Sequence, residues 1–177
     1  MKKIMFNDKF LLTQAVLNGT KTMTRRVIKK EIPFGNWQET EKTLRYKIGE
    51  VVAIAQCYLD IKKPQFDKFW HDAAGNTNKM FVRADLMPHH IKNTDVRVER
   101  LQDITDEDCL KEGIMHFIPA DDEECTEDGY GYLTSDGGLF MFDTPREAFA
   151  ELINKICGKG TWERNPWVEA YTFTRVD

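Results

Sequence analysis

The pattern of apolar and polar positions along the chain switches between a helical period and a strand period. Apolar residues recur at helical spacing in three segments, which are 10–17, 104–113 and 144–156. Two-residue alternation, or a continuous apolar run rich in β-branched residues, predicts strands over 22–28, 51–59, 79–84, 95–101 and 168–176. Because these strands are mostly joined by turns, with helices between some of them, the pattern predicts an α+β fold around a small barrel of about five or six strands.

Residues with known preferences for helix ends delimit the predicted helices. Asp8 is the expected N-cap of the first helix, and Asn18-Gly19 its stop, because glycine adopts left-handed backbone angles without strain. The third helix begins with a threonine, a proline and a glutamate at Thr144, Pro145 and Glu147, an arrangement that forms a capping box.

Composition narrows the class of protein. The chain has 177 residues, of which 41% are hydrophobic, so it is able to bury a core as a single domain. The net charge of −4 gives no general attraction to nucleic acid, and RNA binding would need a local basic patch. The N-terminus turns polar too early for a signal peptide, and no apolar run is long enough to cross a membrane.

Cysteine and histidine spacing argues against a metal centre. The four cysteines form no C-x-x-C pair, and the four histidines do not lie at ligand spacing from them. We therefore expect a reduced, cytoplasmic protein without a metal or another cofactor.

The stretch 19–26, Gly-Thr-Lys-Thr-Met-Thr-Arg-Arg, carries the densest candidate chemistry. It lies at the predicted turn from the first helix into the first strand. A lysine packed against hydroxyl groups can hold a phosphate or carbonyl oxygen, or take a proton from a threonine or from water. The alternative is a solvated edge strand with ordinary surface charges, and these residues alone leave both interpretations open.

Glu112 lies in the last turn of the second helix, where the helix dipole disfavours a carboxylate. Either a basic partner lies nearby in space or the side chain is simply exposed. Its position in the helix alone favours exposure.

Three motifs together resemble the ASCH family of the PUA-like superfamily. They are Gly19-x-Lys21-x-x-Thr24-x-Arg26, the segment from Asp103-Ile104-Thr105 to Glu112-Gly113, and Trp162-x-x-Asn165-Pro166-Trp167-Val168. The resemblance implies a compact β-barrel with helices beside a cleft that holds RNA or a nucleotide. It also implies one domain, 1–177, with insertions near 29–45, 60–78 and 118–143.

Many family members have glutamate where this chain has Thr24. The same departure occurs in bacterial ASCH enzymes that hydrolyse N4-acetylcytidine to cytidine and acetate. The resemblance to these enzymes implies that Lys21, Thr24 and Glu112 are catalytic, and that their side chains converge on one pocket. Lys21 must then lie in the turn, because positions 21 and 24 face opposite sides of a regular strand. Alanine at any of the three positions would abolish activity with little change in melting temperature.

Four more residues are candidates for substrate binding. Arg26 lies on the family motif, and Arg25, Arg83 and Trp162 are further candidates. For both arginines of the motif, pairing with carboxylates is the structural alternative. A small nucleoside fits the net charge better than long RNA, since the acidic loop 121–128 would repel phosphate. A non-catalytic RNA- or nucleotide-binding module is the alternative function, and a ribonuclease-like activity ranks third.

Overall fold

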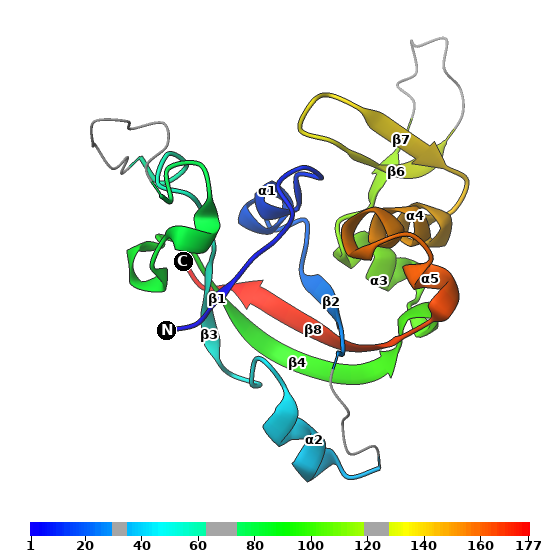
Figure 1. Cartoon of the computed structure of the whole chain (residues 1–177). Coiled ribbons are helices and arrows are strands. Elements are labelled where there is room, and N and C mark those ends of the chain that lie inside the picture. Colours follow the sequence, from blue (N-terminus) through cyan, green and yellow to red (C-terminus); the bar gives the residue numbers. More distant parts are fainter. Residues whose placement is uncertain (30–34, 63–73, 119–127) are drawn as a thin grey trace.

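The computed structural model describes residues 1–29, 35–62, 74–118 and 128–177. Its strands form two sheets (Figure 1). The larger sheet has the strand order β1-β3-β4-β8-β2, and the smaller sheet has the order β5-β6-β7. The bounds are β1 Lys3–Ile4, β2 Met23–Val27, β3 Val51–Ile54, β4 His90–Arg100, β5 Met115–Phe117, β6 Gly129–Leu133, β7 Leu139–Phe142 and β8 Trp167–Arg175.

The long antiparallel pair of β4 and β8 is the centre of the larger sheet. It runs from Ile91 opposite Arg175 to Arg100 opposite Trp167, with an irregularity between Asn93 and Asp95. In Figure 1 the two strands form one curved ribbon, with both termini near one end and the helices α3, α4 and α5 near the other. This curvature gives the sheet a concave side for the core.

Within the described ranges, five α-helices and three 3-10 turns accompany the sheets. The helices are α1 Leu12–Leu17, α2 Trp37–Thr43, α3 Asp106–Lys111, α4 Pro145–Cys157 and α5 Thr161–Arg164, and the 3-10 turns are η1 Lys79–Phe81, η2 Ala84–Leu86 and η3 Leu101–Asp103. The Thr144 side chain accepts a hydrogen bond from the Glu147 backbone, which confirms the predicted start of α4. Ala148, Phe149 and Leu152 bury the inner face of this helix in the core.

The predicted α+β class is confirmed, whereas a closed barrel is not observed. Strands β1 and β2 stand at opposite ends of the strand order and are not paired with each other in the described part of the chain. Closure depends on hydrogen bonds between these edges, which local patterns do not specify.

Two local predictions were wrong. Residues 79–84 form η1 and the start of η2 rather than a strand, because the Lys3 ammonium binds the carbonyl oxygens of Lys79, Met80 and Val82. Carbonyls that converge on one cation cannot alternate as they do in a strand. Asp8 is not the cap of α1: the N-cap is Leu11, and the Asp8 carboxylate accepts from Thr13 and from Lys79.

One predicted strand is shorter than expected. The strand predicted over 51–59 ends at Ile54. Residues 161–164, after α4, form the short helix α5. Residues 121–127 of the acidic loop, and 63–73 of the insertion expected near 60–78, lie outside the described residues.

The segment 118–143 contributes structure of its own where it is described. Strands β6 and β7 form a hairpin, and β5 pairs with β6. Tyr132 of β6 is only 1% exposed and joins the main hydrophobic core. Among the described residues, no helix has the length and apolar character needed to cross a membrane.

Candidate functional site

Lys21 lies in the turn between α1 and β2, as the geometry required. Gly19 has a φ of 79°, and the Lys21 backbone N–H donates to the Ala15 carbonyl at 3.0 Å. The next residue, Thr22, donates its N–H to the Lys111 carbonyl at 2.9 Å, which ties the turn to the end of α3. Gly113 follows that helix with a φ of 103°, and a Cβ there would lie 3.2 Å from Leu12. The two turns therefore pack directly against each other.

Lys21 and Glu112 form a buried ion pair at this junction. The Lys21 Nζ donates to Glu112 Oε2 at 2.7 Å and to the Glu112 carbonyl oxygen at 2.5 Å. The two residues are only 2% and 5% exposed. Burial lowers the pKa of Lys21 below its ordinary value, although the carboxylate acts in the opposite direction. Glu112 is thus not exposed, and the basic partner considered from the sequence is Lys21.

Arg25 organises the acidic side of the site. Its guanidinium donates to Glu112 Oε1 at 3.2 Å, to Glu99 Oε1 at 2.7 Å and to Asp108 Oδ2 at 2.8 Å. Its Nε also donates to Glu99, so four of its five N–H groups are used. Arg25 therefore matches the alternative of an arginine paired with carboxylates, and its contacts position Glu112.

Asp108 extends this network toward the surface. Its Oδ2 also accepts from Arg97 at 2.6 Å. Burial alone would raise the pKa of Asp108, but the hydrogen bonds from Arg25 and Arg97 lower it below the ordinary value. Lys21, Arg25, Arg97 and Lys111 thus pair with three carboxylates, which belong to Glu99, Asp108 and Glu112.

A cavity with a volume of about 280 Å³ opens beside the ion pair. Lys21, Thr24 and Glu112 all line it, so the predicted trio does converge on one cavity. Thr24 is 5% exposed, and within the described part of the chain no hydrogen bond engages its hydroxyl group. A hydroxyl without a protein partner is able to donate to, or react with, a molecule in the cavity.

The other wall of the cavity is apolar. Phe149, Leu152, Ile153 and Ile156 of α4 line it, with Phe6 from the segment after β1. Cys157, the last residue of α4, also reaches the cavity, and burial raises the pKa of its thiol.

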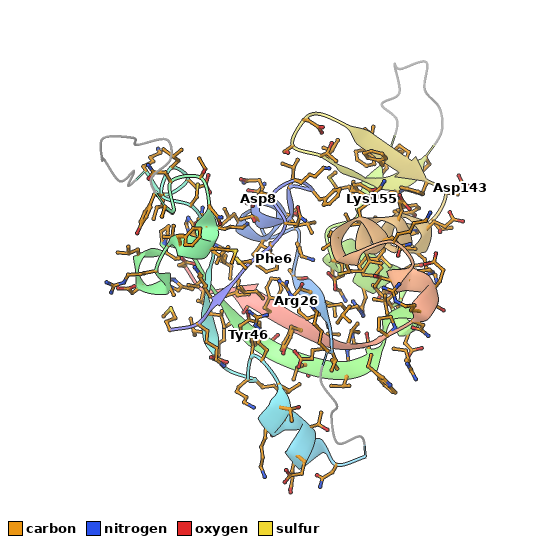
Figure 2. The ribbon with its side chains drawn as sticks, viewed as in Figure 1. Phe6, Asp8, Arg26, Tyr46, Asp143 and Lys155 are labelled. Atoms are coloured by element: carbon orange, nitrogen blue, oxygen red, sulfur yellow. The ribbon has the colours of Figure 1, made fainter. Side chains whose placement is uncertain are left out.

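Arg26 lies between the polar and the apolar walls. Figure 2 shows Phe6 and Arg26 next to each other near the centre of the molecule, and the guanidinium carbon is 5.7 Å from the centre of the Phe6 ring. Its Nη2 donates to the Met5 carbonyl oxygen at 2.6 Å. Arg26 thus lines the cavity, and its role in substrate binding stays a prediction.

Two other predicted residues lie elsewhere. Arg83 is exposed and pairs with Asp85 beside η2. Trp162 of α5 packs against Phe149 and lies under the guanidinium of Arg146. Neither lines the cavity, so no contact described here supports substrate binding by either residue.

Sequence reasoning missed several residues of the site. Arg97 and Glu99 belong to the strand predicted over 95–101, and its two-residue alternation gives no sign that α3 lies against its polar side. The helical spacing of apolar residues over 144–156 likewise gives no sign that part of α4 lines a cavity. Among the described residues, no group of three or more histidine, cysteine or acidic side chains is arranged to bind a metal.

The site thus consists of a buried lysine–carboxylate pair and a free hydroxyl in an amphipathic cavity. No family model matches the chain, and no curated protein matches it. Among solved structures, the crystal structure of protein EF3133 from Enterococcus faecalis, of family model DUF984, aligns with a TM-score of 0.40 and 15% identity. The alignment covers 94% of this chain and 67% of that one. A similarity this small carries no argument about activity.

Proposed function

We propose that the protein is an amidohydrolase that removes the acyl group from an acylated pyrimidine nucleoside such as N4-acetylcytidine. The observation that carries this proposal is the buried Lys21–Glu112 pair, 2.7 Å apart, in a cavity that also contains the Thr24 hydroxyl. Amide hydrolysis needs a nucleophile, a proton carrier and positive charge near the developing oxyanion.

Lys21 is the general base of the proposed reaction. A neutral lysine amine has two N–H groups, and Glu112 accepts hydrogen bonds at two oxygens, the carboxylate Oε2 and the main-chain carbonyl. The remaining lone pair is then available to take a proton from Thr24 or from a water molecule. The lowered pKa of Lys21 favours this neutral form.

The activated oxygen attacks the carbonyl carbon of the acyl group, and Arg26 stabilises the negative charge that develops on the carbonyl oxygen. The C–N bond then breaks, and Lys21, supported by Glu112, returns the proton to the leaving exocyclic nitrogen. If Thr24 is the nucleophile, water hydrolyses the acyl-threonine in a second step; if water attacks directly, the carboxylate forms at once. The sum is water plus acylated amine giving amine and carboxylic acid.

The size of the cavity supports a small substrate. A volume of 280 Å³ corresponds to about nine water molecules at ~30 Å³ each. This is room for an acylated base, with the ribose at the opening, and not for a folded RNA.

The family and compartment belong to the same proposal. Two of the motifs that resemble the ASCH family meet at the Lys21–Glu112 contact, which supports membership of the PUA-like superfamily with its barrel. Cys57, Cys109 and Cys157 are free thiols, which supports a reducing, cytoplasmic location.

The test is cytidine release from N4-acetylcytidine, followed by chromatography. Lys21→Arg keeps the positive charge but cannot deprotonate, so it should lower kcat by a factor of about 10² or more. Thr24→Val should lose activity, and Thr24→Ser, which keeps the hydroxyl, should retain most of it. No turnover of any acylated nucleoside, together with salt-sensitive RNA binding, would instead establish the binding module.

A further inference from the structure

The guanidinium of Arg26 has donors that the protein does not use. Its Nη2 bonds the Met5 carbonyl, but its Nε is buried and has no hydrogen-bond partner among the described residues. A buried donor without an acceptor costs free energy, and such groups in native proteins usually have a functional reason.

Arg26 also lacks a counter-charge. The carboxylates of Glu99, Asp108 and Glu112 pair with Lys21 and Arg25, which are buried, and with Arg97 and Lys111, which are about half exposed. In the described part of the chain no ion pair involves Arg26. Glu169 is its partner in the register of β2 and β8, but the Glu169 carboxylate accepts from the Tyr171 hydroxyl at 2.5 Å. Arg26 is therefore a cation of the cavity lining that no described carboxylate pairs with.

Part of the lining of the cavity is apolar. Leu152, Ile153 and Ile156 of α4 offer aliphatic surface to any ligand that approaches Arg26. With space for about nine water molecules, the cavity matches a ligand that has one anionic head and a short apolar tail.

We propose that this cavity binds a small monocarboxylate, with its carboxylate on Arg26 and its aliphatic tail against α4. Arginine presents its N–H groups in a planar fork that fits a carboxylate. Inorganic phosphate carries more than one negative charge at neutral pH and has no apolar tail, so it fits the single cation Arg26 and the α4 wall less well than a monocarboxylate does. The role of this carboxylate as retained product rests on the proposed function, because hydrolysis releases such an acid; binding itself needs no catalysis.

Calorimetric titration of the protein with hexanoate and with hexanamide tests the charge. The two probes have the same length, and hexanoate should bind at least tenfold more tightly. Butyrate should bind about 15-fold more weakly than hexanoate, since each buried methylene contributes about a fourfold change. Equal affinity for hexanoate and hexanamide, equal affinity for butyrate and hexanoate, or displacement of hexanoate by inorganic phosphate would overturn the proposal.

Two variants locate the binding. Arg26→Met should remove the preference for hexanoate over hexanamide, whereas Arg26→Lys should keep most of it. Arg175→Met is the matched control: Arg175 also donates to a main-chain carbonyl, that of Leu17, and does not line the cavity. If Arg26→Met fails to fold, the Arg26→Lys variant and the comparison of hexanoate with hexanamide on the unaltered protein still decide whether the cavity binds a carboxylate.

The two proposals fail separately. Hexanoate binding without turnover of any acylated nucleoside would refute the reaction and keep the carboxylate site. Turnover of N4-acetylcytidine without measurable hexanoate binding would refute the carboxylate site and keep the reaction.

Discussion

Replacing Glu112 by glutamine tests the ion pair most directly. The substitution keeps the shape of the side chain but removes the charge that faces Lys21 Nζ at 2.7 Å and Arg25 Nη1 at 3.2 Å. Removing one member of a buried ion pair costs about 3–5 kcal/mol, because the remaining charge stays in the interior without compensation.

The protonation equilibrium of Lys21 sets an upper limit on the part of this cost that comes from the unpaired lysine. Lys21 can escape the penalty by losing its proton, and for a lysine with an ordinary pKa of 10.5 this costs about 4.8 kcal/mol at pH 7. We therefore expect Glu112→Gln to reduce the free energy of unfolding by about 3–5 kcal/mol at pH 7. The melting temperature should then fall by roughly 10 °C, as judged from the size of the chain. This corrects the expectation that substitutions in the trio leave the melting temperature nearly unchanged.

The pH dependence has a definite sign. Once Lys21 is neutral in the folded variant, each unit of pH toward 10.5 lowers the cost of deprotonation by about 1.4 kcal/mol. Urea unfolding of the native protein and the variant at pH 7, 8 and 9 should thus give a steadily smaller difference in the free energy of unfolding.

Glu39→Gln is the control for this experiment. Glu39 pairs with Lys42 on the surface of α2, where both side chains are more than half exposed, at 51% and 71%. Loss of this surface ion pair should change the free energy of unfolding by less than about 0.5 kcal/mol at pH 7, 8 or 9. Two results would contradict the reasoning that Lys21 and Glu112 depend on each other as a buried pair. One is a difference in the free energy of unfolding below about 1 kcal/mol between the native protein and Glu112→Gln at pH 7. The other is a difference that does not change with pH.

Three further predictions follow from the structure. The rate of cytidine release should rise with pH and level off below 10.5, because burial lowers the pKa of Lys21 and the base must be neutral; a profile without this rising limb would exclude Lys21 as the base. Iodoacetamide should alkylate Cys157 and block turnover, and alkylation should be faster at higher pH because burial raises the pKa of this thiol. The Cys157→Ser variant should keep its activity after the same treatment, and inhibition that persists in this variant would place the alkylated residue elsewhere. Gly131→Ala should reduce the free energy of unfolding by about 1–3 kcal/mol in urea titration, because its Cβ would lie 1.9 Å from the Phe140 carbonyl oxygen of β7; a change under 0.5 kcal/mol would show that the hairpin yields easily.

Local patterns predicted the elements that carry the site. The glycine after α1 and the strand pattern that follows predicted the turn and β2, and the helical spacing over 104–113 predicted α3. These features depend on residues within a few positions of one another, so one sequence is enough to identify them.

Contacts between distant segments could not be predicted in this way. The position of Glu112 in its helix favoured exposure, and only the resemblance to a family suggested its partner. The strand predicted at 79–84 was wrong because Lys3, more than seventy residues earlier, binds its carbonyl oxygens. Closure of a barrel likewise depends on which strands become edges, which periodicity does not determine.

The contact between Lys21 and Glu112 spans 91 residues of chain. A loop of that length closes late, at an entropic cost that only long-range contacts can offset. Neither half of the polypeptide alone therefore contains the site, and a nascent chain lacks it until α3 and α4 have emerged and docked. Catalysis, where it is found, would then serve as a sensitive reporter of completed folding.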